Sequence, residues 1–475
     1  MKVLVFNRGE IAVRACLAAK KLGLRSALFL TPADHEGPAA RLADEIHLCP
    51  DAEPARSFLS LEELSRAVRE TGASHVYPGY GFLSESEELA RAVAEAGALL
   101  VGPPVEALRV TAHKGRAAEL ARRCGLATLS VASEPSAADF PVLLKAARGG
   151  GGRGNAFVER PEQFADALRQ LQHRALSLFR DDAILVERFL TQARHVELQF
   201  FGFGGLGVLA LGTRDCSLQR NHQKVVEEGP AAPPVAAALQ PHVEAICREL
   251  GALGYRGAGT VEFLWDVARR QLHFLEINSR IQVEHPVTEL LIGEDLVEWQ
   301  LREALGLGAE ALFRREVAPR GHAVEARLYA EDPAQGFVPD TGTVHHLFLP
   351  APPHCRWDLG VAEGSRVTPH YDPLLGKLVA WGNDRAEALG RAALALQAAE
   401  LHGVRTNLTF LAAIVQHEAV REDRHTTRWI EEAFLREATG APLPAHVTAE
   451  LPRHGREEPA ASQKSEERWK IAHRR

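Results

Sequence analysis

The sequence predicts a multidomain chain that starts with an α/β unit and continues in α+β units. In about the first hundred residues, short apolar runs alternate with helical patterns. Farther along, apolar runs are joined by short turns, and a long Ala/Leu-rich helical stretch begins near residue 384. Strands that alternate with helices are typical of a parallel, doubly wound sheet, whereas strands joined by turns indicate hairpins.

The N-terminal unit opens with the strand-like KVLVF at residues 2–6. The further strands and helices are expected at 10–23, 26–30, 45–49, 61–72, 74–78, 87–97 and 98–102. The turn after the first strand reads NRGE and lacks the G-x-G-x-x-G pattern of dinucleotide-binding folds. We therefore expect a Rossmann-like sheet, and an NAD-dependent enzyme is disfavoured.

Composition and charge exclude several classes of protein. The 475 residues, 46% hydrophobic and 25% charged, fit two to four globular domains. A net charge of −7 argues against a broad nucleic-acid surface but leaves room for a local anion site. The cysteines show no CxxC spacing, which favours buried reduced thiols over a zinc site. With neither a leader pattern nor a membrane-spanning stretch in the sequence, we expect a cytoplasmic protein.

Shifts in pattern give the expected domain organisation. We expect an N-terminal domain at 1–112, a central domain at 113–329 and a C-terminal α+β domain at 330–440. The last 25 residues, 451–475, hold seven Lys/Arg against four Glu and little apolar material, and we expect a flexible tail at 441–475.

A glycine run, GGGGRG at 149–154, follows an apolar stretch that ends at Lys145. Consecutive glycines let backbone N–H groups wrap around an anion, although such a run is more often just a flexible loop. The pattern is not Walker A, which would end in GK[ST]. A lysine beside a glycine flap favours phosphate binding.

A β-hairpin is expected over residues 260–278, with its turn near 267–270. A turn centred on Arg269 places Glu262 directly opposite Glu276. Because like charges on opposed positions are destabilising, a positive group should lie between them. Oxygen ligands that include Asn278 fit Mg²⁺ or Mn²⁺ held jointly with a nucleotide phosphate. An arginine partner or a shifted register are the alternatives.

The stretch EINSRIQVEHPVTE, residues 276–289, continues this pattern. In an extended chain, one face would carry Glu276, Asn278, Arg280, Gln282 and Glu284. A single regular strand need not run past Asn278, however.

Two further stretches are candidates for a ligand site. RDCSLQRNHQKVVEE at 214–228 is either a solvated basic face or a cleft-lining loop. YPGYGFLSES at 77–86 follows a strand at the carboxyl edge of the first sheet, where ligands of open α/β sheets bind, although a tight turn also explains its glycines.

Together with GHAVEARLYAEDP and YDPLLGKL, these motifs resemble the biotin carboxylase family of ATP-grasp enzymes, from about residue 3 to about 436. The resemblance implies a Rossmann-like N-terminal domain, an ATP-grasp domain with a mobile glycine-rich lid at about 131–203, and a C-terminal α+β domain. The implied reaction is ATP-dependent carboxylation of biotin by bicarbonate through carboxyphosphate.

The same resemblance assigns roles to individual residues. It implies ATP contacts at Lys114, Lys145, Gly151, Gly152, Glu187, Arg188, Phe189, Leu190, His195, Gln219, His222, Glu262 and Glu276. It assigns two divalent ions, Mg²⁺ or Mn²⁺, to Glu262, Glu276 and Asn278. It assigns bicarbonate to Lys224, Arg280, Gln282 and Val283, the general base to Glu284, and biotin to Arg327 and Tyr80.

Three positions depart from the family pattern. Thr213 stands at a usual Glu, Asn221 at a usual Arg, and Asn155 at a usual Met or similar residue. Thr213 and Asn221 flank the basic stretch and could shift it or weaken subunit contacts. None of the three removes a residue with a chemical role, so we expect an active enzyme.

The resemblance also implies partners. Family carrier domains attach biotin within Met-Lys-Met, and the only methionine here is Met1. We therefore expect a separate biotin carboxyl carrier protein, carboxyltransferase subunits and a homodimer, acting in an acyl-CoA carboxylase, with acetyl-CoA carboxylase and fatty acid biosynthesis favoured. The alternatives are another bicarbonate-using ATP-grasp ligase and a catalytically weakened scaffold subunit.

Overall fold

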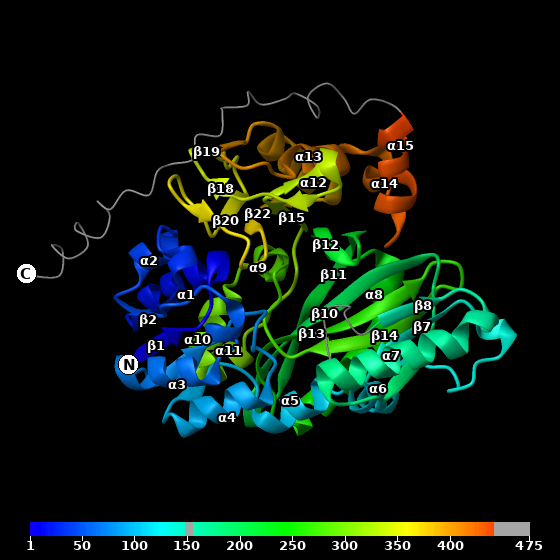
Figure 1. The fold of residues 1–475 in the computed structure, drawn as a ribbon, viewed down its shortest axis with the longest axis horizontal. Coiled ribbons are helices and arrows are strands. Elements are labelled where there is room, and N and C mark those ends of the chain that lie inside the picture. The colour runs from blue at the N-terminus through cyan, green and yellow to red at the C-terminus, as the bar shows by residue number, and fades with distance from the viewer. Residues whose placement is uncertain (148–154, 441–475) are drawn as a thin grey trace, which may run out of the picture.

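The computed structural model describes residues 1–147 and 155–440. Its N-terminal unit is a parallel five-stranded sheet in the order β3-β2-β1-β4-β5, which confirms the doubly wound prediction. Figure 1 labels its strands β1 and β2. The strands are β1 Lys2–Val5, β2 Arg25–Leu30, β3 Glu45–Leu48, β4 His75–Tyr77 and β5 Leu99–Leu100. The helices are α1 Gly9–Lys21, α2 Pro38–Leu42, α3 Leu61–Thr71, α4 Glu87–Glu95 and α5 Val105–Thr111.

The NRGE turn joins the carboxyl ends of β1 and β4. Asn7 Nδ2 donates to the carbonyl oxygens of Pro78 at 2.6 Å and Tyr80 at 2.7 Å. Gly79 lies so close to Asn7 and Ile11 that an added Cβ would meet them at 3.0 and 3.1 Å, and its φ of +60° favours glycine. The turn therefore fixes the 78–80 loop at the ligand-binding edge of the sheet.

The centre of the molecule is a nine-stranded sheet in the order β20-β22-β15-β12-β11-β10-β13-β14-β6. Its strands are antiparallel except for the β14–β6 pair. Their bounds are β6 Ala127–Thr128, β10 Ala193–Phe203, β11 Val208–Arg220, β12 Gln223–Gly229, β13 Arg256–Asp266, β14 Gln271–Asn278, β15 His322–Tyr329, β20 Cys355–Leu359 and β22 Leu374–Gly382. Helices α6 Lys114–Arg123 and α8 Pro233–Ala252 contribute to one core with β10, β13 and β14.

The central sheet continues across residue 330, because β15 pairs with β22 and β22 pairs with β20. An Ala/Leu face of α12 Arg385–Gln397 packs on β15 and β22, together with α13 Leu408–Gln416. The other strands beyond 330 are β16 Glu331–Asp332, β17 Val338–Pro339, β18 Gly342–Thr343, β19 His346–Phe348, β21 Arg366–Val367 and β23 Glu400–His402. The remaining α-helices of the described residues are α9 His285–Ile292, α10 Leu296–Ala304, α11 Ala309–Phe313, α14 Glu418–Arg421 and α15 Leu435–Gly440.

A separate three-stranded sheet, β8-β7-β9, lies beside the central sheet, as β7, β8 and β14 show in Figure 1. It consists of β7 Val142–Ala146, β8 Asn155–Val158 and β9 Ile184–Arg188, with α7 Phe164–Phe179 on one face. Apolar side chains such as Val142 and Leu144 face α7, so the alternating Lys145 is on the other face. The glycine run and the expected tail at 441–475 lie outside the described residues.

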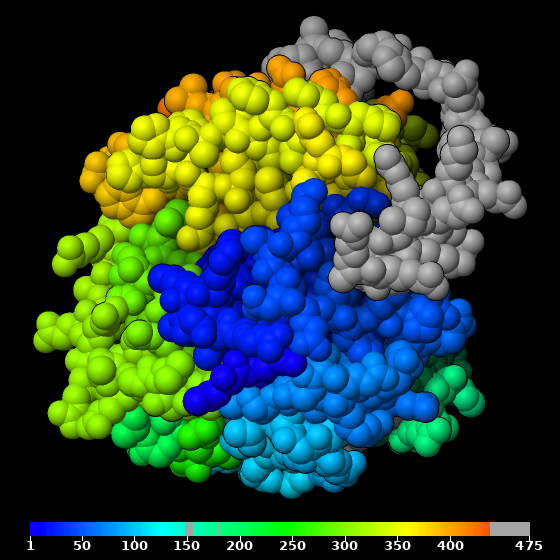
Figure 2. Space-filling view, turned by 90° about the vertical axis from the view of Figure 1, so that its left-hand side faces the viewer, coloured from blue at the N-terminus to red at the C-terminus, as the bar shows by residue number. Residues whose placement is uncertain are grey.

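The N-terminal unit packs against the chain beyond residue 330, as Figure 2 shows for the blue and yellow segments. Arg14 on α1 contributes to this junction. Its guanidinium lies 2.9 Å from Glu289 Oε1 and 3.1 Å from Asp358 Oδ2. All six cysteines are free. Within 1–147 and 155–440, no helix is long and apolar enough to cross a bilayer.

Candidate active site

Glu262 on β13 lies directly opposite Glu276 on β14, as predicted. The register differs nearer the turn, where Phe263 is opposite Phe274, and a bulge between Glu262 and Phe263 restores the predicted pair. The positive group expected between two carboxylates contacts only one of them: Lys224 Nζ lies 3.0 Å from Glu262 Oε1.

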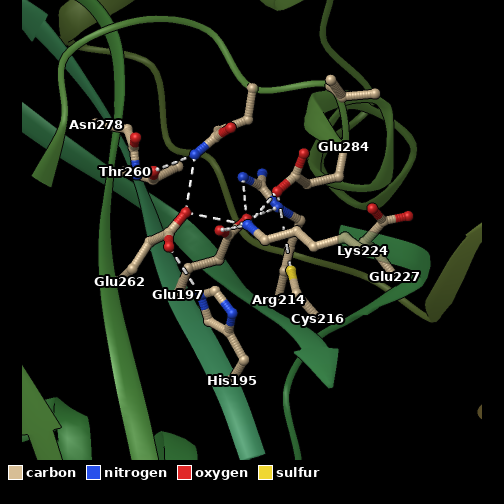
Figure 3. A network of polar contacts seen from close by, with 12 residues as sticks. His195, Glu197, Arg214, Cys216, Lys224, Glu227, Thr260, Glu262, Asn278 and Glu284 are labelled. Atoms are coloured by element: carbon tan, nitrogen blue, oxygen red, sulfur yellow. Dashed lines mark hydrogen bonds and ion pairs between the residues drawn. The ribbon is translucent and has the colours of Figure 1, made fainter. Parts of the chain in front are cut away.

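Lys224 is at the centre of a buried carboxylate cluster. Its ammonium also lies 2.9 Å from Glu197 Oε2 and 2.5 Å from Glu284 Oε1 (Figure 3). The stretch that carries Lys224 was predicted to be either a solvated basic face or a cleft-lining loop. It is a largely buried β-hairpin, so the solvated face and the loop conformation are wrong, while Lys224 does lie at the carboxylate cluster. Residues 214–219 and 225–228 are buried in strands β11 and β12, whereas residues 221–223 are exposed at the turn between these strands.

A chain of hydrogen bonds joins β11 to β13. Gln219 Nε2 lies 2.6 Å from His195 Nδ1, and His195 Nε2 lies 2.8 Å from Glu262 Oε2. His222 does not join this chain. It is exposed at the β11–β12 turn, where it and Asn221 both have positive φ. Asparagine suits such a two-residue turn, which gives the departure at position 221 a local reason.

Glu276 has the properties of a cation ligand. Its carboxylate makes no hydrogen bond or ion pair within the described part of the chain. Burial, and then the neighbouring Glu262, raise the pKa of Glu276. Asn278, two residues on, has a buried Nδ2 without a partner, while its Oδ1 accepts from Arg280 at 3.3 Å. The unpaired Glu276 carboxylate opposite Glu262 gives this place a surplus of negative charge, which fits Mg²⁺ or Mn²⁺.

The regular strand ends at Asn278, and α9 begins at His285. Between them, Arg280 Nε donates to Glu85 Oε2 at 3.1 Å and Arg280 Nη1 to Gln282 Oε1 at 2.7 Å. Gln282 Nε2 in turn donates to Glu262 Oε1 at 2.9 Å. The loop therefore brings Arg280, Gln282 and Glu284 to the cluster without an extended conformation.

Arg327 on β15 lies between two buried carboxyl groups. It donates to Glu284 Oε2 at 2.9 Å and, through Nε, to Glu227. Burial favours a raised pKa for Glu284, but Lys224 and Arg327 outweigh it and hold that pKa well below its usual range. Burial raises the pKa of Glu227 to about 7 despite Arg327. Glu284 is thus ionised, while Glu227 titrates near neutral pH.

Several of the predicted ATP contacts lie on or next to the three-stranded sheet. Lys145 Nζ lies 2.5 Å from Glu187 Oε2, and Lys114 Nζ donates to the Ala146 carbonyl at 3.1 Å. Burial lowers the pKa of Lys114. After Glu187, Arg188 is exposed, the Phe189 ring lies 4.8 Å from that of Phe157, and Leu190 is buried. Gly151 and Gly152 lie outside the described residues.

Tyr80 and Val283, two further predicted site residues, are each hydrogen-bonded to a buried charged residue. The Tyr80 hydroxyl donates to Glu10 Oε1, and the Val283 carbonyl accepts from Lys377 Nζ. Glu10 and Lys377 are both buried and were given no role from the sequence.

Sequence reasoning also missed Glu197, Arg214 and Glu85. Glu197 lies on one face of β10 with His195, so the period-two pattern that identified 276–284 would have found it. Arg214 Nε pairs with the Glu197 carboxylate at 2.5 Å, and neither side chain is exposed. Glu85 lies in YPGYGFLSES, but its contact with Arg280 crosses between domains and leaves no local pattern.

Three family profiles match the chain in order. Residues 1–108 match "Biotin carboxylase, N-terminal domain", 126–311 match "Carbamoyl-phosphate synthase L chain, ATP binding domain", and 325–432 match "Biotin carboxylase C-terminal domain".

Two curated proteins illustrate the likeness. The mitochondrial methylcrotonoyl-CoA carboxylase subunit alpha of Oryza sativa subsp. japonica is 40% identical over 468 residues, which are 95% of this chain and 63% of that subunit. The biotin carboxylase of Haemophilus influenzae is 36% identical over 445 residues, 91% of this chain and 98% of that enzyme. The chain thus spans about three-fifths of the rice subunit.

Solved structures agree. The biotin carboxylase domain of Hydrogenobacter thermophilus 2-oxoglutarate carboxylase, in complex with MgADP, ADP and bicarbonate, has a TM-score of 0.84 and 33% identity, covering 93% of this chain and 99% of that one. Biotin carboxylase from Campylobacter jejuni has a TM-score of 0.83 and 30% identity, covering 90% of this chain and 98% of that one.

A small sheet beside a carboxylate-lined central sheet is the arrangement of an ATP-grasp enzyme. Within that class, this chain belongs to the biotin carboxylase family of ligases, which confirms the resemblance noted in the sequence.

Proposed function

We propose that the chain carboxylates biotin with bicarbonate and MgATP, forming carboxyphosphate on the way. The observation that carries the proposal is the convergence on Glu284. Two cations, the partly buried Lys224 and the buried Arg327, contact its two oxygens at 2.5 and 2.9 Å, and Gln282 and Arg280 adjoin it in the same loop. A bicarbonate ion needs such cations and an ionised base at one point.

The carboxylate has the protonation state that a base requires. Bicarbonate attacks the γ-phosphate of ATP as it loses its proton, and an ionised Glu284 can accept that proton. For this to occur, bicarbonate must displace Lys224 or Arg327 from Glu284. The released Lys224 then faces the anion, which supports its role in binding bicarbonate.

Nucleotide and divalent ions would be held on the Glu276 side of the cluster. Glu262, Glu276 and Asn278 would hold the ions, with Lys145 and Lys114 directed at the phosphates. Ions bound there would neutralise charge on the phosphate oxygens during transfer. Gln219 and His195 orient Glu262 through hydrogen bonds of 2.6 and 2.8 Å.

Arg327 would meet biotin once carboxyphosphate breaks down. Its fixed guanidinium suits the negative oxygen that develops on the ureido group when biotin is deprotonated. The biotinyl group would come from outside these 475 residues, from a carrier protein, and a carboxyltransferase would use the product. An acyl-CoA carboxylase is the proposed assembly, and the relatives named above give acetyl-CoA no preference as its acceptor.

The test uses purified protein with ATP, Mg²⁺ or Mn²⁺, labelled bicarbonate and free biotin. We expect biotin-stimulated ADP formation and labelled carboxybiotin. Lack of biotin stimulation with either metal would overturn the proposal, and ammonia-dependent turnover would favour a ligase that makes carbamoyl phosphate. Arg280→Ala is the control: equal rates for wild type and variant would indicate a non-catalytic scaffold.

A further inference from the structure

Lys377 is a completely buried lysine in the YDPLLGKL motif, to which the reaction gives no role. A buried ammonium is costly unless it is paired and hydrogen-bonded. Lys377 Nζ lies 3.0 Å from Glu10 Oε1 and donates to the Val283 carbonyl oxygen. It also lies 5.9 Å from the centre of the Tyr80 ring.

These contacts join three distant parts of the chain. Glu10 lies on α1 after the NRGE turn, Val283 precedes α9, and Lys377 lies on β22. Helices α1 and α9 both contact β22. Tyr80, whose backbone is held by Asn7, donates its hydroxyl to Glu10, so two N-terminal motifs fix the partner of Lys377.

The contact with Lys377 determines how the Val283 backbone is oriented. The Val283 carbonyl accepts from Lys377, and the preceding Gln282 carbonyl lies 2.7 Å from His285 Nδ1. Because each peptide group is planar, fixing these carbonyls also fixes the N–H groups of Val283 and Glu284. Lys377 thus anchors the loop next to the general base without touching the base itself.

We propose that Lys377 is a positioning residue for bicarbonate. It orients the 282–284 loop so that the Val283 backbone and Glu284 meet the anion together, and Glu10 and Tyr80 hold Lys377 in place. The inference rests on the proposed function, because it concerns the bicarbonate subsite of that reaction.

The opposing interpretation is that Lys377 only cross-links domains. Arg14 provides a matched comparison, because this buried cation also joins α1 to α9 and to the strands beyond 330, through Glu289 and Asp358. Within residues 1–147 and 155–440, Arg14 makes no hydrogen bond or ion pair with residues 282–284. A general loss of stability should therefore follow removal of either cation, whereas a selective effect on bicarbonate should follow only removal of Lys377.

The first experiment measures steady-state kinetics of Lys377→Met and Arg14→Met in the full chain. Loss of a charged donor should raise the bicarbonate KM of Lys377→Met roughly tenfold or more, with the ATP KM within about twofold of wild type. Arg14→Met should lower thermal stability without a selective rise in the bicarbonate KM. A fall in kcat at unchanged bicarbonate KM, or the same split in Arg14→Met, overturns the inference. If Lys377→Met fails to fold, the charge-balanced Glu10→Gln/Lys377→Met variant is measured by the same criteria.

The second experiment does not depend on activity. Hydrogen–deuterium exchange is followed in peptides that span 280–286 in the free protein. Lys377→Met should speed exchange there more than in the rest of the chain, and Arg14→Met should not. Unchanged exchange overturns the positioning role. A wild-type protein without bicarbonate-dependent turnover overturns the proposed function instead, and the exchange result still decides whether Lys377 fixes the loop.

Discussion

Arg327 donates to Glu284 at 2.9 Å while Lys224 contacts the other oxygen of the same carboxylate at 2.5 Å. Both oxygens of the proposed base are therefore occupied by cations before any substrate binds. In the proposed reaction, bicarbonate would enter by exchanging with one of these cations, so the base and the anion subsite would act together.

Glu284→Gln removes the proton acceptor and keeps the shape of the side chain. Bicarbonate-dependent ATP hydrolysis should fall roughly 100- to 10,000-fold, which is the usual contribution of a general base. ADP release under saturating bicarbonate measures it, with ATP affinity as the control. Turnover within about fivefold of wild type would exclude Glu284 as the base.

Glu276→Gln should stabilise the metal-free protein and at the same time weaken its interaction with Mg²⁺. Because burial and Glu262 raise the pKa of Glu276 and no cation of the described chain pairs with it, removing its charge should raise the thermal midpoint of the metal-free protein at pH 8. The Mg²⁺ concentration for half-maximal rate should rise roughly tenfold or more. Calorimetry and a Mg²⁺ titration measure the two effects. A destabilised variant with an unchanged Mg²⁺ requirement would contradict the ligand role.

Arg327→Lys keeps a positive charge but loses the planar guanidinium that spans Glu227 and Glu284. Carboxybiotin formation should fall more than bicarbonate-dependent ATP hydrolysis, since only the former needs the cation at the ureido oxygen. Both rates are measured on one preparation. An equal fall in the two would show that Arg327 acts only through Glu284.

Glu227 should make the free energy of unfolding decrease as pH rises. Its folded pKa is raised from 4.5 to about 7, so its contribution to the free energy of unfolding is present below pH 4.5 and is lost as pH rises through about 7. Glu227→Gln lacks this loss, so its stability relative to wild type should increase over that range, by at most roughly 3 kcal/mol.

Urea unfolding at pH 5 and pH 8 measures this difference for Glu227→Gln. The exposed Glu310→Gln is the control and should show no such trend. A pH-independent difference between Glu227→Gln and wild type would mean that Glu227 is ionised throughout.

Much of the fold and part of the site could be predicted from local sequence patterns. The parallel sheet followed from strand and helix alternation, and the Glu262–Glu276 pair followed from the position of one turn. That second success involved a compensation: the observed turn is centred half a residue earlier, with Asp266 opposite Gln271, and a bulge restores the pair. Counting residues from a turn does not predict a bulge, because the packing of neighbouring strands determines where a bulge forms.

Contacts between residues that are far apart in the sequence could not be predicted. Lys224 was expected to bind an anion, but its three carboxylate partners come from β10, β13 and the loop before α9. Lys377 contacts a backbone carbonyl 94 residues away. No spacing within the sequence encodes such pairs, since they arise only when the separate elements pack.

The sheet that crosses residue 330 limits how this protein can be dissected. A polypeptide ended at 329 would leave β15 as an unpaired edge and remove the covering helix α12, so the fragment would tend to pair with other copies and aggregate. The sheet β8-β7-β9 carries its own helix and is hydrogen-bonded as a separate unit. It is therefore the segment to exchange with a relative when chimaeras are made.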